Sequence, residues 1–362
     1  MKNLFVSFAS AALVCACTSS QATLLLYDPF DYTAGDRLGG SGTSPLGQVA
    51  PNGQQWITRS PAGGGTYDPT KDTLITAGNL SYPGLAPSSG NSARYGSSTS
   101  PAGLYTDAIA LPSAVTSGSL YYSAIVKFHG AIPTGGARTS YASFSTDTAN
   151  PLSDAGFGVG TASGTANVPL PASAWIRNSG TTQYQLGGGK QNGDGLGTSA
   201  SAPSWQAAAA FPNQQGNTAG TGQDWATIEN NPAQPYFIVM KYTFNSPSVN
   251  SDDTVSMWLN PIASTLGNNA GETTAGATGG SYYSAINAYT TANLDASQIQ
   301  SFMLLGLAQS SGSTTKSIDL SFDELRIGTS WADVTPTTVP EPGGLTLLGL
   351  GMLGLLGSRR RN

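Results

Sequence analysis

The chain is poor in charged side chains, which make up 10% of its 362 residues, against roughly 25% in an average soluble domain. Residues 23–336 carry 11 basic and 19 acidic side chains, a net charge of −8. A protein that binds nucleic acid needs a basic surface to neutralise phosphates, and no segment here supplies one. The sequence therefore excludes nucleic acid as a partner.

Cysteine and histidine are almost absent. The two cysteines, Cys15 and Cys17, lie near the start, so a chain cut after residue 22 has neither a disulfide nor thiol chemistry. His129 is the only histidine, which excludes a zinc site built from several histidines. No Gly-x-Ser-x-Gly turn precedes a helix, as a serine hydrolase of the α/β class requires. We expect His129 to be a surface residue at the end of a strand.

Long apolar runs are also missing, except for a short one at each end. At the N-terminus, Lys2 precedes the apolar residues 4–16, and the sequence SQA ends at Ala22. This order is typical of a secretory signal peptide over residues 1–22, cut between Ala22 and Thr23. The sequence VCAC ending at Cys17 is an imperfect lipobox, so acylation of Cys17 is an alternative fate.

The apolar run at the C-terminus spans residues 343–357, which is 15 residues, whereas a relaxed membrane helix needs about 20. The run predicts a short transmembrane helix within a C-terminal signal over residues 337–362. Two prolines stop the helix from extending at its start, and an arginine cluster at its end stays on the cytoplasmic side. The residues concerned are Val339, Pro340, Glu341 and Pro342 at the start, and Arg359, Arg360 and Arg361 at the end.

This tail closely resembles the PEP-CTERM sorting signal, which has a Pro-Glu-Pro motif, a short glycine-leucine helix and terminal arginines in the same order. The resemblance implies an exported protein that is held transiently in the inner membrane. An exosortase-type sorting protease then cuts the tail, and the protein passes to the cell surface or the extracellular matrix. The alternative is a plain membrane anchor that is never cut.

The middle of the chain alternates apolar and polar residues in short runs separated by turn residues, the pattern of β-strands. The strongest strand pattern covers residues 119–130, and only residues 284–302 have a helical period. About a dozen strands without a helical layer predict an all-β fold, two antiparallel sheets packed as a sandwich. Residues 207–225 and 264–281 are low in complexity, and we expect them to be mobile surface insertions.

Three stretches, residues 24–40, 237–261 and 318–336, are similar to concanavalin A-like lectin/glucanase domains, including their LamG-like branch. The resemblance implies one jelly-roll domain over residues 23–336 that binds glycan or matrix polysaccharide. It also implies a structural calcium ion where the first and last strands meet, with Asp28, Asp31 and Asp323 as candidate ligands. The simpler alternative is that Asp31 caps a turn and Asp323 is solvated.

Catalytic carboxylates are not readable in the sequence. The glucanases of this superfamily carry a Glu-x-Asp-x-x-Glu pattern on one strand, and a retaining pair must lie about 5 Å apart. Between the signal peptide and the tail, the only glutamates are Glu229, Glu272 and Glu324, and none has a carboxylate two or four residues further along a strand. Asp323 and Glu324 are adjacent, so alternation predicts that they point to opposite faces.

We therefore expect a non-enzymatic domain without catalytic residues. The aromatic side chains that could stack against sugar rings are Trp175, Tyr184, Trp205 and Trp225. Two alternatives remain open, a purely structural surface protein without a ligand and a glycosidase whose carboxylates converge from distant strands.

Overall fold

The protein is described here from a computed structural model. Its described residues are 23–40, 46–59, 69, 72–95, 106–129, 139–146, 169–178, 183–192, 226–229, 234–245, 252–275, 281–286, 295–305, 308–311, 314–317 and 319–337. The predicted signal peptide, the sorting segment from residue 338 onwards and the predicted insertion 207–225 lie outside this set. Within the set, no helix is long and apolar enough to cross a membrane.

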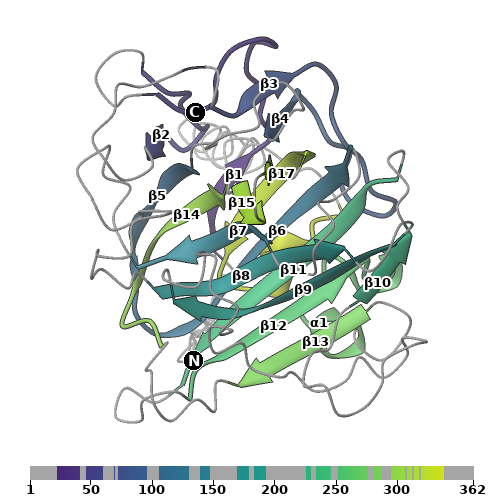
Figure 1. Cartoon of the computed structure of the whole chain (residues 1–362). Coiled ribbons are helices and arrows are strands. Elements are labelled where there is room, and N and C mark those ends of the chain that lie inside the picture. Colours follow the sequence, from purple (N-terminus) through teal and green to yellow (C-terminus); the bar gives the residue numbers. More distant parts are fainter. Residues whose placement is uncertain are drawn as a thin grey trace, which may run out of the picture.

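Two large antiparallel sheets form the body of the protein (Figure 1). The first has eight strands. Seven follow one another in the order β13 (Ser281–Ile286), β12 (Thr254–Leu259), β11 (Tyr236–Phe244), β6 (Gly118–Phe128), β17 (Leu320–Gly328), β4 (Ser92–Tyr95) and β3 (Leu74–Thr76), and β1 (Leu24–Asp28) also pairs with β17.

The second sheet has seven strands. Their order is β10 (Ala226–Glu229), β9 (Gln183–Asn192), β8 (Pro169–Asn178), β7 (Thr139–Ser145), β14 (Ile299–Leu305), β5 (Thr106–Val115) and β2 (Trp56–Arg59). A separate hairpin is formed by β15 (Ala308–Ser311) and β16 (Thr314–Ser317).

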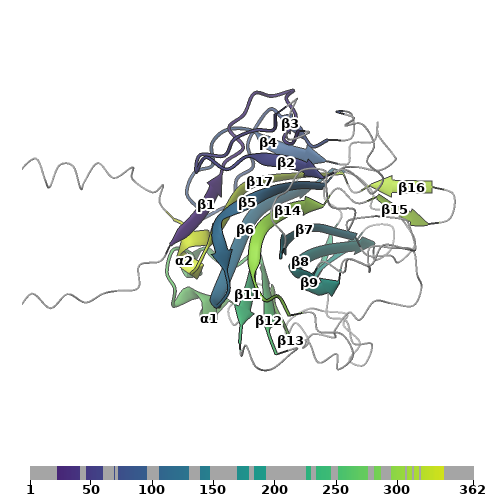
Figure 2. The same ribbon diagram turned by 90° about the vertical axis from the view of Figure 1, so that its left-hand side faces the viewer.

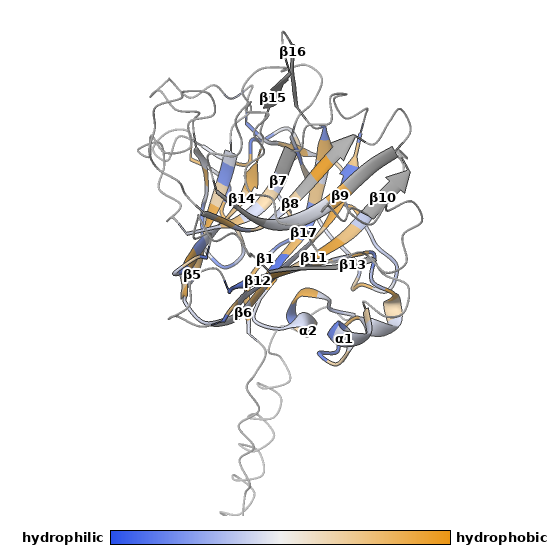
Figure 3. Ribbon diagram, turned by 60° about the horizontal axis from the view of Figure 1, so that its bottom comes forward, coloured by the Kyte–Doolittle hydropathy of each residue, from blue (hydrophilic) through white to orange (hydrophobic). Residues whose placement is uncertain are grey.

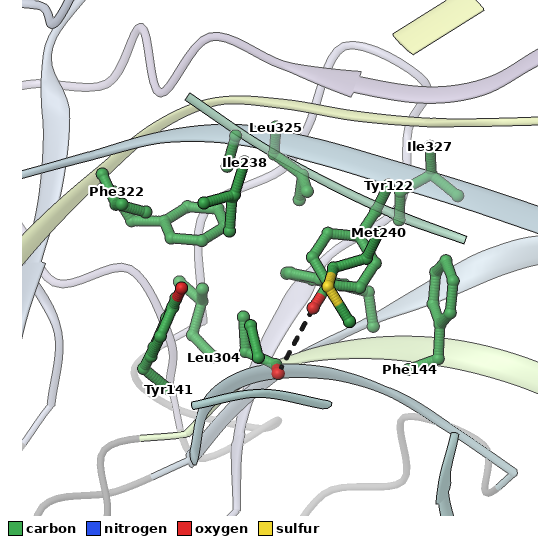
Figure 4. Close-up of a cluster of buried hydrophobic side chains, with 14 of the residues drawn as sticks. Tyr122, Tyr141, Phe144, Ile238, Met240, Leu304, Phe322, Leu325 and Ile327 are labelled. Atoms are coloured by element: carbon green, nitrogen blue, oxygen red, sulfur yellow. Dashed lines mark hydrogen bonds between the residues drawn. The ribbon is translucent and has the colours of Figure 1, made fainter. Parts of the chain in front are cut away.

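The two sheets pack face to face (Figure 2). Between them lies an apolar core to which β6, β7, β11, β14 and β17 all contribute (Figure 4). Aromatic rings meet edge to face there, for example Tyr122 with Phe144 at a centroid distance of 5.0 Å. The buried hydroxyl of Tyr122 donates to the carbonyl of Ala172 at 2.9 Å. The predicted all-β, two-sheet antiparallel sandwich is confirmed.

Strand β6 shows why the eight-stranded sheet is buried on both faces. Its alternate residues Leu120, Tyr122, Ala124 and Val126 belong to the core between the sheets. The residues between them, Tyr121 and Ile125, belong to a second apolar cluster on the other face. Figure 3 shows hydrophobic residues along strands of both sheets. A strand that is apolar on both faces must be covered on both.

Short helices cover this second face (Figure 2). They are the 3₁₀ helix η3 (Ala263–Thr265), α1 (Gly271–Ala275) and α2 (Trp331–Val334). Helix α2 begins with a capping box, in which the Ser330 hydroxyl accepts from the Asp333 amide and the Asp333 carboxylate accepts from the Ser330 amide. The Trp331 indole is 1% exposed and lies 5.0 Å from the Trp258 ring.

Two expectations from the sequence fail here. The helical period of residues 284–302 does not extend over its two ends, which are the strands β13 and β14, and residues 287–294 lie outside the described residues. Tertiary pairing has overridden a weak local pattern. The expected mobile insertion 264–281 instead contains η3 and α1, and α1 is tied to the sheet by the bond from Lys241 Nζ to Glu272 Oε1 at 2.7 Å.

Candidate functional site

A group of buried ionisable side chains surrounds a β-bulge in β17. Along one edge, residues Leu320–Phe322 pair with β4 and residues Leu325–Gly328 pair with β1, and the register with β6 shifts between Asp323 and Arg326. Glu324 has a φ of 54°, a conformation that costs energy for any residue with a Cβ. Strand β17 contains one extra residue relative to β6 at the point where its other neighbour changes from β4 to β1.

The bulge corrects a prediction made from the sequence. Phe322 and Leu325 both lie in the core between the sheets, so Asp323 and Glu324 both turn to the outer face. Simple alternation placed them on opposite faces, but a bulge puts two successive residues on one side. Both carboxylates accept from backbone amides of the covering loop, Asp323 from Leu80 at 2.6 Å and Glu324 from Ser89 at 3.2 Å.

Arg326 completes this group, and we call Tyr27, Asp323, Glu324 and Arg326 the bulge cluster. The guanidinium carbon of Arg326 lies 3.8 Å from the centroid of the Tyr27 ring, and its Nη2 lies 3.3 Å from Glu324 Oε2. The Tyr27 hydroxyl donates to Glu324 Oε1 at 3.2 Å. Burial, with the Glu324 charge in addition, raises the pKa of Tyr27 to about 12. The hydroxyl therefore keeps its proton and serves as a donor.

Burial also governs the two acidic groups of the cluster. It raises the pKa of Asp323 to about 9, although two backbone amides donate to this carboxylate. Burial raises the pKa of Glu324 as well, while the charge of Arg326 opposes that rise. Arg326 and Glu324 are only 4% and 6% exposed, so the pair is held out of bulk water.

The predicted calcium ligands do not converge. The first and last strands do meet, since Asp28 lies opposite Leu325. Asp28 is fully buried, and it accepts from the Phe30 amide at 2.8 Å, the Tyr32 hydroxyl at 2.6 Å and the Trp56 indole at 2.7 Å. Its oxygens are thus engaged by protein donors, and burial raises its pKa. Asp31 is exposed.

Another group fits a cation better. Among the described residues, Asp252, Asp253 and Asp295 are the one set of three acidic side chains that offer ligand oxygens all within 4.8 Å of one another. Asp253 accepts from the Tyr242 hydroxyl at 2.5 Å and the Asn245 amide at 2.7 Å, which orients its carboxylate. Hard oxygen ligands of this kind suit calcium. The adjacent aspartates in the sequence SDDT were the only local sign of this group.

A further pair of carboxyl groups, those of Asp72 and Asp107, lies at the end of the core, and Asp107 belongs to β5. Asp107 is fully buried and accepts from the hydroxyls of Thr58 and Thr73. Burial and the neighbouring Asp72 raise the pKa of Asp107 well above its usual value. An added Cβ at Gly39 would lie 2.4 Å from Asp107 Oδ1, so the pair is enclosed and has a structural role.

The outer face of the seven-stranded sheet is buried where it is described, with serines on three strands beside Met303 and Leu305 of β14. Ser143 on β7, Ser173 on β8 and Ser301 on β14 are fully buried, and the hydroxyl of Ser173 donates to that of Ser143 at 3.0 Å. The seven strands together contain two carboxyl groups, those of Asp107 and Glu229. Asp107 lies two residues before the core residue Ile109 on β5, so alternation places it on the inner face of the sheet. Glu229 lies on the edge strand β10, opposite Gln183.

The register separates two of the aromatic residues predicted to stack on sugars. Trp175 pairs with Gly187, and Tyr184 pairs with Asn178. Ile176 and Leu186 are core residues, so position 184 has the inner-face alternation and position 175 the outer. Alternation therefore assigns positions 175 and 184 to opposite faces of the sheet. Trp205 and Trp225 lie outside the described residues.

The other singled-out residues make contacts with the fold. His129 directly follows β6, as expected, and its Nε2 lies 2.7 Å from the Ser321 hydroxyl. Burial lowers the pKa of His129, which favours the neutral ring. Glu272 accepts from Tyr121 and Lys241, whereas Glu324 belongs to the bulge cluster.

The chain beyond the described residues decides where the protein goes. Residues 338–361 match the family model of the PEP-CTERM protein-sorting motif. The chain carries a C-terminal sorting signal. This match confirms the resemblance of the tail, including the Pro-Glu-Pro motif and the terminal arginines. It marks the protein for export and for anchoring through its C-terminus.

Solved structures similar to this one are β-sandwich proteins. A family 7 alginate lyase A1-II′ in complex with substrate is 12% identical over 76% of this chain and 93% of its own, with a TM-score of 0.35. LamAcat from Zobellia galactanivorans is 11% identical over 84% and 97%, with a TM-score of 0.36. The winged bean acidic lectin complexed with methyl-α-D-galactose is 8% identical over 86% and 98%, with a TM-score of 0.31. No curated protein sequence matches the chain.

Proposed function

We propose that this chain is a protein of the cell surface or extracellular matrix whose sandwich binds a polysaccharide or matrix polymer without catalysis. Its tail is held transiently in the inner membrane, and an exosortase-type protease then cuts the tail. The observation that carries this proposal is the sorting motif that begins at residue 338, directly after the last described residue of the domain, Thr337.

The closure of the domain before the motif supports processing. Thr335 is fully buried, its hydroxyl accepts from the Gly267 amide at 3.1 Å, and the Pro336 carbonyl accepts from the Ala86 amide at 2.8 Å. These contacts of the described fold are made before the motif begins. Removal of the tail would leave the sandwich and its outer layer intact.

The distribution of carboxyl groups supports a role without hydrolysis. A glycosidase needs two carboxyls roughly 5–9.5 Å apart across the sugar-binding face. On the seven-stranded sheet, Asp107 has the alternation of the core residue Ile109, and Glu229 belongs to the edge strand β10. On the eight-stranded sheet, Asp323 and Glu324 are held by amides of a covering loop.

The proposed binding face is the outer face of the seven-stranded sheet. Position 175 has the alternation of this face. Tryptophan stacks on the apolar C–H surface of a sugar ring. Calcium is a proposed structural cofactor, bound by Asp252, Asp253 and Asp295, where its charge would offset the repulsion among three carboxylates.

The processing half of the proposal is tested by intact-mass analysis of protein from a native host. We expect a chain that begins at Thr23 and lacks residues 343–362. A mature protein that retains its tail would contradict cleavage, and a mass that includes acylated Cys17 would contradict the cleavage site at Ala22.

The binding half is tested on the mature protein with a polysaccharide array. Trp175→Ala should reduce retention at least tenfold, whereas Tyr184→Ala, a matched aromatic deletion at inner-face alternation, should not. Equal losses in both variants would point to misfolding, and no retention of the wild type would favour a purely structural surface protein.

A further inference from the structure

A small cavity lies between the outer face of the eight-stranded sheet and the segment that precedes the sorting motif. Its lining includes Ser123 and Ile125 from β6, Glu324 and Arg326 from β17, and Val334 and Pro336 from the C-terminal segment. The space has room for about one water molecule. Any occupant must therefore be very small.

One polar atom at this cavity has no partner among the described residues. Nη1 of Arg326 is buried and donates to no acceptor among those residues, while Nη2 of the same guanidinium donates to Glu324 Oε2. The arginine as a whole is 96% buried, since its exposed fraction is 4%. A buried N–H donor without an acceptor destabilises the fold, and more so when the donor is charged. Such a donor is a strong indication of an unseen acceptor.

We propose that the cavity binds one ordered water molecule, which accepts a hydrogen bond from Arg326 Nη1. Two further partners line the same space. The Ser123 hydroxyl donates to the Val334 carbonyl at 2.5 Å, which leaves its oxygen able to accept. The Glu324 carboxylate can accept as well. A buried water typically makes about three hydrogen bonds, and these three groups meet that number.

Charge and size exclude other occupants. The guanidinium repels a cation, and Glu324 already neutralises the charge of Arg326, so an anion gains little attraction. Apolar side chains of Leu85, Phe237 and Val334 complete the lining and offer no further donors. Water is the one ligand that is small enough and that can accept from Arg326 while donating to Ser123 and Glu324.

The cavity lies next to the segment that leads into the sorting motif. Val334 and Pro336 close the cavity from outside, and the motif begins two residues later. The water therefore links the bulge cluster to the last docked residues of the domain. Its loss would loosen that segment, measurable as faster amide exchange at Thr335, whose amide donates to the Trp331 carbonyl at 3.0 Å.

A double-mutant cycle tests the proposal. Ala86 lines the cavity and is 8% exposed, so Ala86→Val fills the space and expels the water. Ala86→Val should lower Tm by at least 2 °C more in the wild-type background than in an Arg326→Met background. Only in the wild-type background does loss of the water leave the charged Arg326 donor without an acceptor. Equal shifts in the two backgrounds, or a smaller loss in the wild type, contradict the proposal.

A crystal structure provides an independent measurement and decides the question if the Arg326→Met variant fails to fold. We expect an ordered water 2.7–3.2 Å from Nη1, the normal range for such a bond. An Nη1 atom bonded to a protein carbonyl, or a dry cavity, would overturn the proposal.

Discussion

The two sheets differ in the faces that they turn away from the core. The eight-stranded sheet carries a second apolar layer, with Trp258 and Trp331, and ionic ties such as Lys241 to Glu272 at 2.7 Å. The seven-stranded sheet carries serines and glycines on its outer face, such as Ser143 and Ser173. Ionisable side chains thus help to close the eight-stranded sheet, while the described outer face of the seven-stranded sheet is buried through neutral side chains such as Ser143, Ser173 and Met303.

The largest effect should follow from the removal of the second apolar layer. Trp331→Ala deletes a buried indole that packs on Trp258 and donates to the Thr265 carbonyl at 2.7 Å. We expect a loss of about 4 kcal/mol in the free energy of unfolding, measured by chemical denaturation. A loss below about 1 kcal/mol would show that the helical layer contributes little, and would erase the contrast between the two sheets.

A somewhat smaller effect is expected at the bulge cluster. Glu324→Gln removes the negative partner of buried Arg326 and should cost about 3 kcal/mol in the free energy of unfolding, because an uncompensated charge remains inside.

The Glu324→Gln variant also tests for hidden catalysis. Neither it nor Glu272→Gln should change the release of reducing sugar from a polysaccharide panel, and turnover by the wild type that is lost in one variant would establish a glycosidase.

The pH dependence of stability should also reflect the eight-stranded sheet. The folded pKa of Asp323 is raised to about 9 by burial, so folding favours its protonated form. This contribution is fully present below the unfolded value of roughly 4 and is lost as the pH rises toward 9. We expect Tm to fall by several degrees between pH 5 and pH 9, as followed by circular dichroism.

Asp323→Asn should flatten this dependence, because the variant has no carboxyl group to ionise. Asp36→Asn, at an exposed position, is the matched control and should leave the slope unchanged. A slope that is the same in wild type and Asp323→Asn would show that the burial of this carboxyl does not control the response.

The smallest effect is expected on the outer face of the seven-stranded sheet. Ser173→Ala removes one neutral hydrogen bond to Ser143 and should cost about 1 kcal/mol or less, measured as a shift in the denaturation midpoint. A loss as large as that of Trp331→Ala would mean that the outer faces of the two sheets contribute equally to stability, and would erase the contrast between them.

The prediction of the fold succeeded where the pattern was local and strong. Residues 119–130 read as a strand and form β6, and the junction of the first and last strands was correctly expected from the family resemblance. The helical prediction for residues 284–302 was wrong at its two ends, because long-range pairing of β13 and β14 outweighs a short periodic signal.

The candidate site was harder to predict. Tyr27, Glu324 and Arg326 are separated by up to 299 residues, so no spacing rule connects them. The bulge is also invisible in the sequence, since it arises where β17 changes partner from β4 to β1. For the same reason the sequence placed Asp323 and Glu324 on opposite faces, and it grouped Asp28, Asp31 and Asp323 as ligands that do not converge.

The sequence by itself determined that this protein is sorted through its C-terminus and that it folds from strands. Both depend on local order, since the motif at residues 338–361 is contiguous and strand alternation repeats every two residues. The tertiary structure alone decided which carboxyls are buried, which share a face and which donor lacks an acceptor. These properties depend on the strands and loops that meet in space, and a register shift of one residue is enough to change them.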